Sequence, residues 1–462
     1  MKSTIPKKHL ITPEDLPLYD LRHIFSAGTF WFESGMKDAV ATFDLFVRNT
    51  PPKRNFLVFG GLDEITRGVL NWRYSEEDVK YLLYEGIITP GFANYLKKFK
   101  FSGSISAMPE GTIFFGGEPV VRVTAPLIEA NTITMFLMNS LCGNTIFLSK
   151  IIRNVIASNP KPCIGVAGLR AQSFESAFKC ARASYIAGAI GGNSVPSVAK
   201  KLGKPFRQPL SFAYHAVISS FPTEIEAMRK MAKLFKGKIG LMVDTYDFKQ
   251  GVENAIIVAK ELKRDNMSVC GITIDSGNLA QRCFYVRKRL DAEGLNDVKI
   301  TLASNLDEYT ISRFNKNRVP VDAFLIATEA ISVSDSPKLE VVYKISQIQH
   351  KGKTKNLAKF SAGKESYPGE KQVFRMLEKD KYVKDVIGLE GEKLGKPLLV
   401  PIINNGKQVY ELPDLDEIRA YVASQLKQLP ERYLRVDKEY KYPIDISPKL
   451  KKMFEEVRKE YL

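Results

Sequence analysis

The chain has 462 residues, 44% of them apolar, which is enough for two or three domains with a sizeable hydrophobic core. Its 68 Lys and Arg against 51 Asp and Glu give a net charge of +17, which favours anionic partners such as phosphorylated metabolites, nucleic acid or an acidic surface. Most of this charge is dispersed, with only short clusters such as 200–204 and 449–459, so we expect a solvated surface and no nucleic-acid partner.

The N-terminus and the cysteines favour a cytoplasmic protein. Residues 1–16 lack the apolar core of a signal peptide, and because no run of about 18 apolar residues is evident we expect no membrane span. The five cysteines are odd in number and have no CxxC spacing, which is typical of reduced cytoplasmic thiols. The four histidines are scattered, which argues against a structural zinc site.

In chain order, residues 37–130 predict antiparallel β-structure mixed with helices. Short runs of Val, Ile and Phe alternate there with turn signals, as in "ATFDLFVRNTPP" (41–52) and "TIFFGGEPVVRVTAP" (112–126). At the other end, the Lys- and Gly-rich piece 349–372 predicts a loop or connection, and regular structure resumes over 397–429.

The middle of the chain alternates short apolar runs with helical patterns. Strand and helix candidates follow one another at 239–244, 249–265, 269–275, 278–294, 298–304, 306–316 and 322–328. Repeated βα units of this kind predict a parallel sheet. The four strand candidates end on the polar residues Asp244, Asp275, Ser304 and Thr328. Because parallel α/β folds place their chemistry at the carboxyl ends of strands, these positions are candidate site residues.

Segments spread over nearly the whole chain resemble the motifs of one enzyme family. They include "VATFDLFVRNTPPKRNFLVFGGLDEI" (40–65), "LMVDTYDFKQGVENAI" (241–256), "IDSGNLA" (274–280), "LASNLDE" (302–308) and "SYPGEKQVFR" (366–375). Together, in this order and spacing, they are similar to the nicotinate phosphoribosyltransferases of NAD salvage.

The resemblance implies a fold, an assembly and a reaction. The fold is α/β, an irregular parallel βα-barrel flanked by an α+β domain built from both chain ends, which divides the chain at 1–145, 146–345 and 346–462. The family forms homodimers with active sites at the subunit interface. It joins nicotinate to phosphoribosyl pyrophosphate with the help of Mg²⁺, and the use of ATP is a further expectation.

The turn after the strand candidate 269–275 is the centre of the expected site. Asp275 suits ribose hydroxyls or Mg²⁺, and Gly277 would allow backbone to approach a phosphate closely. The alternative is an ordinary helix N-cap turn, with Ser276 or Asn278 as the cap. Asp244 is a further candidate; its alternative is a helix cap, a role for which Asp247 is better suited.

Two basic residues complete the expected catalytic set. The resemblance implies that His215 takes phosphate from ATP, whereas on residues alone it reads as a histidine among apolar neighbours. Arg170 resembles the second arginine of a family pair that binds carboxylate or phosphate bidentately. Its alternative is a surface ion pair with Glu175.

The remaining candidates would hold substrate. Ser304 and Asn305 would bind the 5′-phosphate from the start of a helix, or merely cap it. Thr328 is what remains of a phosphate-cradling Gly-x-Gly-Thr motif that reads "LIAT" here. The family's base-stacking tyrosine aligns with His23, and Tyr19 lies close by.

The chain departs from the family at several binding motifs. Thr273 and Leu169 stand where arginines are expected, Ser211-Phe212 replaces a Gly-Thr pair, and 191–194 reads "GGNS" instead of "GTSN". Each lost arginine removes a charge-assisted bond of about 1.5–3 kcal/mol, unless lysines in 199–205 or Arg207 compensate. Three functions therefore stay open: transfer to nicotinate, transfer to nicotinamide or another heterocycle, and a catalytically silent binding or partner subunit.

Overall fold

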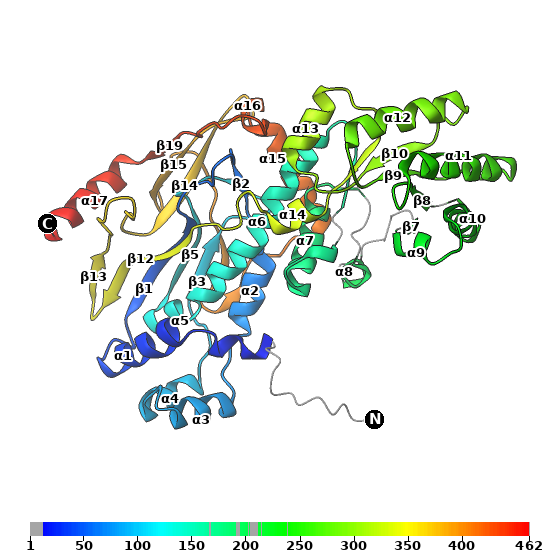
Figure 1. Ribbon diagram of the computed structural model, residues 1–462. Coiled ribbons are helices and arrows are strands. Elements are labelled where there is room, and N and C mark those ends of the chain that lie inside the picture. The colour runs from blue at the N-terminus through cyan, green and yellow to red at the C-terminus, as the bar shows by residue number, and fades with distance from the viewer. Residues whose placement is uncertain are drawn as a thin grey trace.

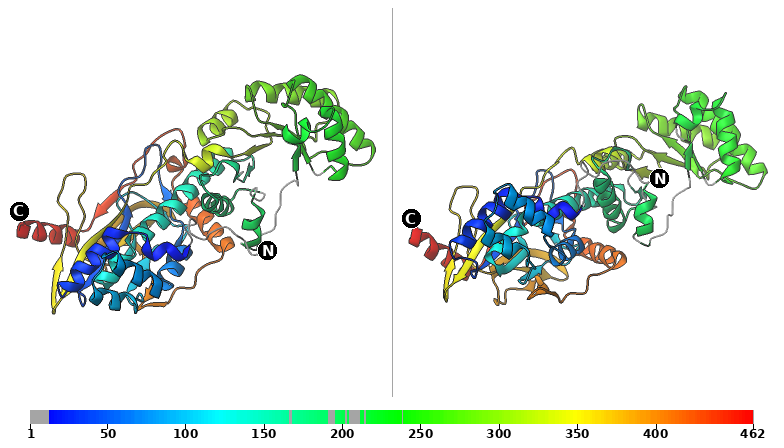
Figure 2. Two further views of the ribbon diagram at one scale, coloured as in Figure 1. Left: turned by 60° about the horizontal axis from the view of Figure 1, so that its bottom comes forward. Right: turned by 90° about the horizontal axis from the view of Figure 1, so that it is seen from below.

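The computed structural model describes residues 13–165, 168–190, 195–201, 203, 211–213, 215–237 and 239–461. These residues form two regions that lie end to end (Figure 1). One region contains both chain ends and an antiparallel sheet, whereas the other is built on a parallel sheet from the middle of the chain. Figure 2 shows the second region, in green, projecting from the first in two further views.

The first region is built on a seven-stranded antiparallel sheet. The pattern of residues 37–130 predicted antiparallel β-structure for the part of this sheet that they form. In spatial order its strands are β13 (Lys353–Asn356), β12 (Val341–His350), β1 (Val40–Val47), β5 (Pro119–Pro126), β3 (Ser104–Ala107), β17 (Val400–Asn404) and β18 (Lys407–Gln408). In β1, Val40 is paired with Gln349 on one side and Pro126 on the other. Segments from both ends of the chain are therefore interleaved in a single sheet.

Smaller sheets complete this region. A four-stranded sheet runs β16 (Lys396–Pro397), β14 (Lys371–Glu378), β15 (Lys381–Leu389) and β19 (Ile444–Ile446), and β2 (Leu57–Val58) pairs with β4 (Ile113–Phe114). The prediction that 349–372 is a loop was wrong at both ends, because β12 ends at His350, β13 follows at Lys353 and β14 begins at Lys371. β13 is a mostly exposed edge strand, where Lys is common, so its composition resembles that of a loop.

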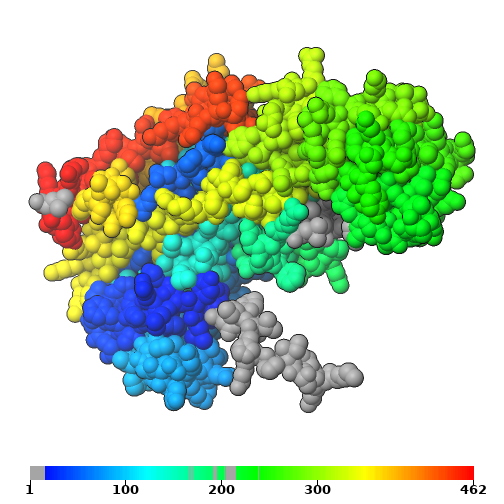
Figure 3. All heavy atoms as spheres, viewed as in Figure 1, coloured from blue at the N-terminus to red at the C-terminus, as the bar shows by residue number. Residues whose placement is uncertain are grey.

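Helices surround these sheets. They are the short η2 (Pro13–Leu18) and η3 (Leu21–Ser26), then α1 (Ala27–Glu33), α2 (Leu62–Leu70), α3 (Glu76–Tyr84), α4 (Pro90–Leu96), α5 (Leu127–Thr132), α6 (Thr134–Ser158), α15 (Leu415–Gln428), α16 (Glu431–Leu434) and α17 (Pro448–Tyr461). The C-terminal segments pack beside the N-terminal ones, as the red and blue surfaces in Figure 3 show. Asn55, for example, donates to the backbone oxygens of Tyr433, Arg435 and Lys438.

Helix α6 lies at the junction of the two regions. It is long and apolar enough to cross a membrane by length and composition, with a mean hydropathy of 1.3 over its best window. It is not an uninterrupted apolar run, because Asn139, Asn144 and Lys150 lie within it. In addition, 72% of that window is buried inside the protein, as in a core helix. The helix also carries buried Lys150 and Arg153 and passes through the expected domain boundary at 145/146.

The second region is built on a six-stranded parallel sheet, as the βα alternation predicted. Its strands, in spatial order, are β6 (Cys163–Ile164), β11 (Ala323–Leu325), β10 (Lys299–Leu302), β9 (Gly271–Ile274), β8 (Ile239–Met242) and β7 (Ser211–Ala213). Its helices are η4 (Gly168–Arg170), α7 (Phe174–Ile186), α8 (Pro196–Lys201), α9 (His215–Ser219), α10 (Glu224–Leu234), α11 (Phe248–Arg264), α12 (Leu279–Ala292), α13 (Glu308–Lys316) and α14 (Thr328–Ser332). Ile272 and Ile274 belong to the buried core, and strand alternation turns Thr273 to the opposite face.

Among the described residues this sheet is open. β6 and β7 form its two edges, so the closed irregular barrel implied by the family resemblance is not seen. β6 is only two residues long, and beyond it lies a single bridge between Ile164 and Ile190. The sheet thus agrees with the expected α/β class and parallel order.

Candidate active site

The parallel sheet gathers most of the predicted site residues along one edge. Because all six strands run parallel, their carboxyl ends share an edge, and each is followed by a candidate. Across the sheet from β6 to β7, these candidates are Arg170, Thr328, Ser304 with Asn305, Asp275 with Gly277, Asp244, and His215. Residues more than 150 positions apart in the chain, such as Arg170 and Thr328, meet there at hydrogen-bond distance.

Asp244 and Asp275 form the centre of this edge. Asp244 Oδ2 accepts the backbone N–H of Asp275 at 3.1 Å and the hydroxyl of Ser276 at 2.6 Å. The side chain of Asp244 is 1% exposed, whereas that of Asp275 is 38% exposed. Asp244 therefore supports the turn from beneath, and Asp275 presents its carboxylate to the solvent side.

The ionisation of Asp275 reflects this arrangement. Burial raises the pKa of Asp275 above its usual value, and the negative charge of Asp244 raises it further. Electrostatic interactions with His215 and Arg170 act in the opposite direction and lower this pKa. Burial and the neighbouring carboxylate of Asp244 therefore outweigh the nearby basic groups in setting the pKa of Asp275.

This pair fits a divalent cation. Asp244 Oδ1 is buried and has no hydrogen-bond partner among the described residues, so one carboxylate oxygen lacks compensation. Mg²⁺ commonly takes one or two carboxylates and completes its shell with water and substrate phosphates. In the described part of the chain no three His, Cys, Asp or Glu side chains gather as a metal cluster, so substrate would have to supply further ligands.

His215 begins α9, at the end of β7, and faces this pair. Its Nδ1 lies 3.0 Å from the hydroxyl of Thr245, and its Nε2 lies 3.9 Å from Asp275 Oδ2. A histidine that exchanges a proton or a phosphoryl group needs one ring nitrogen held and the other facing its reactant. Thr245, which was not singled out in the sequence although it follows Asp244 directly, supplies the hold.

Arg170 and Thr328 form the opposite end of the row. Arg170 Nη1 donates to Thr328 Oγ1 at 3.0 Å, and Thr328 is the first residue of α14. The alternative ion pair with Glu175 is not formed, because Glu175 pairs with Lys179 instead. The guanidinium is therefore oriented by the strand-end residues and has donors left for an anion.

Ser304 and Asn305 lie before α13, not at its start. The helix begins at Glu308, and its N-cap is Asp307, whose carboxylate accepts the N–H of Thr310 at 2.7 Å. Ser304 has a φ of +81°, which is unusual for a residue with a side chain. The expectation that these two residues open the helix was wrong, and they form a strained turn at the end of β10.

Gly277 is required by the geometry of its own turn. Its φ is +70°, and an added Cβ would lie 2.6 Å from Cζ of Arg282. The cap of the following helix is Asn278, which accepts the N–H of Gln281, as the alternative interpretation proposed. The glycine thus admits a guanidinium; its contact with a phosphate stays a prediction.

Arg282 is a site residue that the sequence did not reveal. Its Nη1 donates to the backbone oxygen of Ser276 at 3.0 Å and to the Ser276 hydroxyl at 2.9 Å, and lies 3.5 Å from Asp244 Oδ2. The guanidinium also lies 4.3 Å from the ring centroid of Phe248. A signal was present, because an arginine one turn after an N-cap points back over that cap.

Tyr19 and His23 are not brought to this edge within one copy of the chain. His23 Nδ1 bonds Asp20 at 2.6 Å, and Asp20 caps η3 in the first region. Helix α1, which follows directly, lies at the opposite end of the molecule from β8–β10 (Figure 1). Both side chains are about half exposed, so they are free to contact another molecule.

The positions that depart from the family are only partly described. Thr273 is buried, and its hydroxyl has no partner among the described residues. The side chains of Leu169, Ser211 and Phe212, and all of 191–194, lie outside the described residues. The same holds for Arg207 and for part of the lysine-rich segment 199–205.

Comparisons with known proteins identify the family and the fold. Profiles of the nicotinate phosphoribosyltransferase N-terminal and C-terminal domains match residues 23–142 and 393–454. The chain is 35% identical over 434 residues to nicotinate phosphoribosyltransferase pncB2 of Mycobacterium tuberculosis, covering 93% of this chain and 91% of that protein. It is 32% identical over 458 residues to the nicotinate phosphoribosyltransferase of Bacillus subtilis, covering 93% and 92%.

Two solved structures share the fold. Human nicotinic acid phosphoribosyltransferase superposes with a TM-score of 0.82 at 21% identity, over 95% of this chain and 99% of that one. Nicotinate-nucleotide pyrophosphorylase from Pyrococcus furiosus superposes with a TM-score of 0.72 at 22% identity, over 92% and 99%. At these identities the superpositions establish the architecture alone.

Proposed function

Because this chain belongs to the nicotinate phosphoribosyltransferase family, we propose that it transfers phosphoribosyl from phosphoribosyl pyrophosphate to nicotinate in NAD salvage. The ring nitrogen of nicotinate bonds to the anomeric carbon, and the bond from that carbon to the pyrophosphate oxygen breaks. Pyrophosphate leaves with the electron pair, and nicotinate mononucleotide remains. The observation that supports this best is the row of polar side chains from Arg170 to His215 on one edge of the parallel sheet.

Each part of the row suits one part of the reaction. The exposed carboxylate of Asp275 faces the ribose and steadies the positive charge that develops on the sugar. Asp244 holds that carboxylate in place through the Asp275 N–H. Arg170 binds the carboxylate of nicotinate or a phosphate. When bound at Asp275, Mg²⁺ supplies positive charge to the departing pyrophosphate.

His215 is suited to coupling the reaction to ATP. With Nδ1 held by Thr245, the other ring nitrogen is the acceptor of the γ-phosphoryl group, and ADP leaves with the bonding electrons. The phosphohistidine then lies beside the pyrophosphate site, where its breakdown can be tied to product formation.

A homodimer would complete the base site. Tyr19 and His23 are exposed side chains of the first region, whereas the strand ends belong to the second region. A second copy that places this surface against the row would let one of the two stack on the nicotinate ring. Light scattering of the purified protein tests the dimer.

The fold, the domain division and the location expected from the sequence are compatible with this function. The open parallel sheet and its covering helices are in keeping with an irregular βα-barrel. The division at 1–145, 146–345 and 346–462 stays a proposal, and α6 and β12 run across its two boundaries. A cytoplasmic location suits an enzyme that consumes phosphoribosyl pyrophosphate and five cysteines that form no disulfide.

Transfer to nicotinamide or another heterocycle is the second candidate. Thr273, in place of the expected arginine, leaves the site with one cation fewer for an acidic base. The test incubates the protein with phosphoribosyl pyrophosphate, Mg²⁺ and a panel of bases, with and without ATP, and identifies products by mass. Nicotinate mononucleotide as main product is expected. Another nucleotide would favour the second candidate, and no product together with no calorimetric binding of phosphoribosyl pyrophosphate would indicate a silent subunit.

A further inference from the structure

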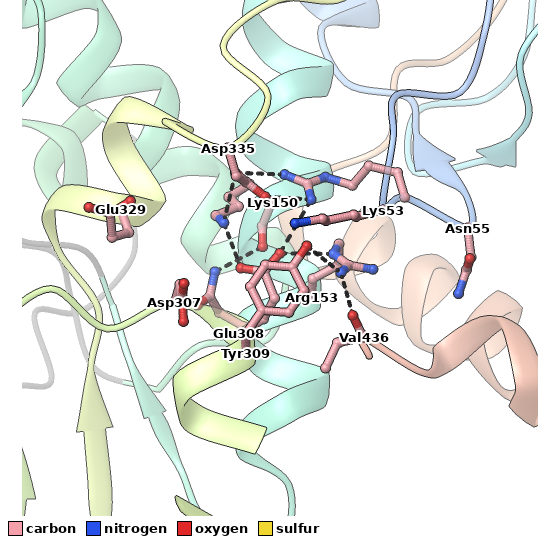
Figure 4. Close-up of polar contacts among 12 residues, drawn as sticks. Lys53, Asn55, Lys150, Arg153, Asp307, Glu308, Tyr309, Glu329, Asp335 and Val436 are labelled. Atoms are coloured by element: carbon pink, nitrogen blue, oxygen red, sulfur yellow. Dashed lines mark hydrogen bonds and ion pairs between the residues drawn. The ribbon is translucent and has the colours of Figure 1, made fainter. Parts of the chain in front are cut away.

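A buried ion network lies where the two regions meet, next to the substrate loops (Figure 4). Lys150 Nζ lies 2.6 Å from Glu308 Oε2 and 3.0 Å from Asp335 Oδ1. Arg54 reaches both oxygens of Asp335, at 2.8 and 3.0 Å. Arg153 Nε donates to Glu308 Oε1 at 2.9 Å. Three cations thus share two carboxylates.

The network is almost sealed from water. The side chains of Glu308, Lys150, Arg153 and Arg54 are no more than 3% exposed, and only Asp335 is accessible, at 23%. Burial raises the pKa of Asp335, but bonds and charges from Arg54 and Lys150 outweigh it and hold the pKa below its usual value. Because a lone buried charge is strongly unfavourable, each member constrains the positions of the others.

The members come from separate parts of the chain. Arg54 precedes β2, and Lys150 and Arg153 lie one turn apart on α6, all in or bordering the first region. Glu308 is the first residue of α13, three residues after Asn305. Asp335 follows α14, which Thr328 begins. The two carboxylates therefore anchor the segments that follow β10 and β11.

One of these segments needs such an anchor. Ser304, with its φ of +81°, adopts a backbone conformation that persists only where surrounding contacts impose it. Glu308 lies four residues later and is held by both Lys150 and Arg153 of α6, so it fixes the C-terminal end of this turn.

We propose that Glu308 and Asp335 are positioning residues that lock the loops after β10 and β11 onto α6, so that Ser304, Asn305 and Thr328 hold a phosphate of phosphoribosyl pyrophosphate. The proposal rests on the proposed function. It implies that loosening the network weakens binding of phosphoribosyl pyrophosphate far more than binding of the base, because both carboxylates of the network belong to the phosphate loops.

Asp335→Asn tests this with little change of shape. We expect KM for phosphoribosyl pyrophosphate to rise about 10- to 100-fold, with KM for the base within about twofold. Arg54→Lys, which keeps the charge but loses the two-pronged bond to Asp335, is the milder second variant. Asp335→Glu, which keeps the charge, should restore part of the affinity.

Asp385→Asn is the matched control. Asp385 and Arg375 form another buried pair, with Nη2 and Oδ2 2.6 Å apart, in the four-stranded sheet of the first region. This variant should lower the melting temperature and leave both KM values unchanged. Equal changes in both KM values in Asp335→Asn, or unchanged values in Asp335→Asn and Arg54→Lys, would overturn the proposal.

Calorimetry separates this proposal from the proposed function. If the wild type makes no nucleotide, the proposed function fails, but binding of phosphoribosyl pyrophosphate with Mg²⁺ can still be compared. Weaker binding by Asp335→Asn than by the wild type supports the positioning role. Equal binding by the two proteins, or no binding by the wild type, contradicts it.

Discussion

The backbone N–H of Asp275 donates to the carboxylate of Asp244 across 3.1 Å, which joins the ends of β9 and β8. Of the two acids, Asp244 is buried and Asp275 is exposed. Asp244 also accepts the Ser276 hydroxyl, so the turn that presents Asp275 is held at two points. The two carboxylates therefore have different roles despite similar positions at strand ends.

Replacing Asp275 with Asn should abolish turnover and preserve the fold. The amide keeps the shape but cannot stabilise a cationic sugar or bind a divalent ion, so kcat should fall about 100-fold or more. Steady-state kinetics and a thermal melt measure the two effects. Asp291→Asn, on the exposed side of α12, is the control and should retain activity. Wild-type turnover in Asp275→Asn would refute the assignment.

Replacing Thr245 with Val should reduce phosphorylation of His215. Valine has the shape of threonine but no hydroxyl for Nδ1, and the loss of one such bond corresponds to about 2- to 10-fold. Acid-labile incorporation of phosphate from labelled ATP is the measurement. Thr245→Ser retains the hydroxyl and should behave like the wild type. Equal incorporation in the Val and wild-type proteins would remove Thr245 from the mechanism.

Replacing Arg282 with Met should impair catalysis more than stability. The change keeps contact with the ring of Phe248 but removes charge-assisted bonds worth about 1.5–3 kcal/mol, which corresponds to roughly 10- to 150-fold in kcat/KM. Arg287→Met is the control, because Arg287 bonds the backbone oxygens of Leu295 and Val298 beyond the C-terminal end of the same helix. Parallel loss of activity in both variants would indicate a general effect on α12.

Gly277→Ala and Gly294→Ala separate backbone strain from crowding. The φ angles of the two glycines are +70° and +68°. Because alanine is strained in this left-handed conformation, each substitution should lower the free energy of unfolding by about 1–2 kcal/mol. Nothing lies within 4 Å of a Cβ at 294, whereas a Cβ at 277 meets Arg282. Chemical denaturation should show the larger loss for Gly277→Ala. The double variant Gly277→Ala, Arg282→Ala should recover the difference; equal losses in the two single variants would contradict the contact.

Glu118 should give stability a distinct pH dependence. Burial raises the pKa of Glu118 well above its usual value, Asp385 raises it further, and Arg375 opposes them. Because the pKa of Glu118 is higher in the folded than in the unfolded protein, protonated Glu118 stabilises the fold. This contribution is complete below the unfolded-state pKa near 4.5 and is lost as the pH rises towards the folded-state pKa. The Glu118→Gln variant has a neutral side chain of the same shape, so its stability should not fall in this way. Denaturation between pH 5 and 8 should therefore show a steeper decline for the wild type, and equal slopes would contradict the assignment.

The elements around the parallel sheet could be predicted because they are determined locally. Observed α11 (Phe248–Arg264) and α12 (Leu279–Ala292) lie within two residues of the predicted 249–265 and 278–294. Apolar spacing selects a helix, and the residue before it caps it, as Asp247 does for α11. The edge strand β13 escaped prediction because an exposed strand carries no apolar alternation.

Strand-end polarity alone placed Asp244, Asp275, Ser304 and Thr328 on a common edge, since parallel strands must share one. Only the tertiary structure decided which partners the other site residues have. Arg282 lies beside Gly277, the hydroxyl of Thr245 bonds His215, and Glu308 lies among three cations from other segments. The physical reason is that periodicity and capping depend on neighbours a few positions away. A buried charge, in contrast, is satisfied by whichever distant residue the fold brings within about 3 Å.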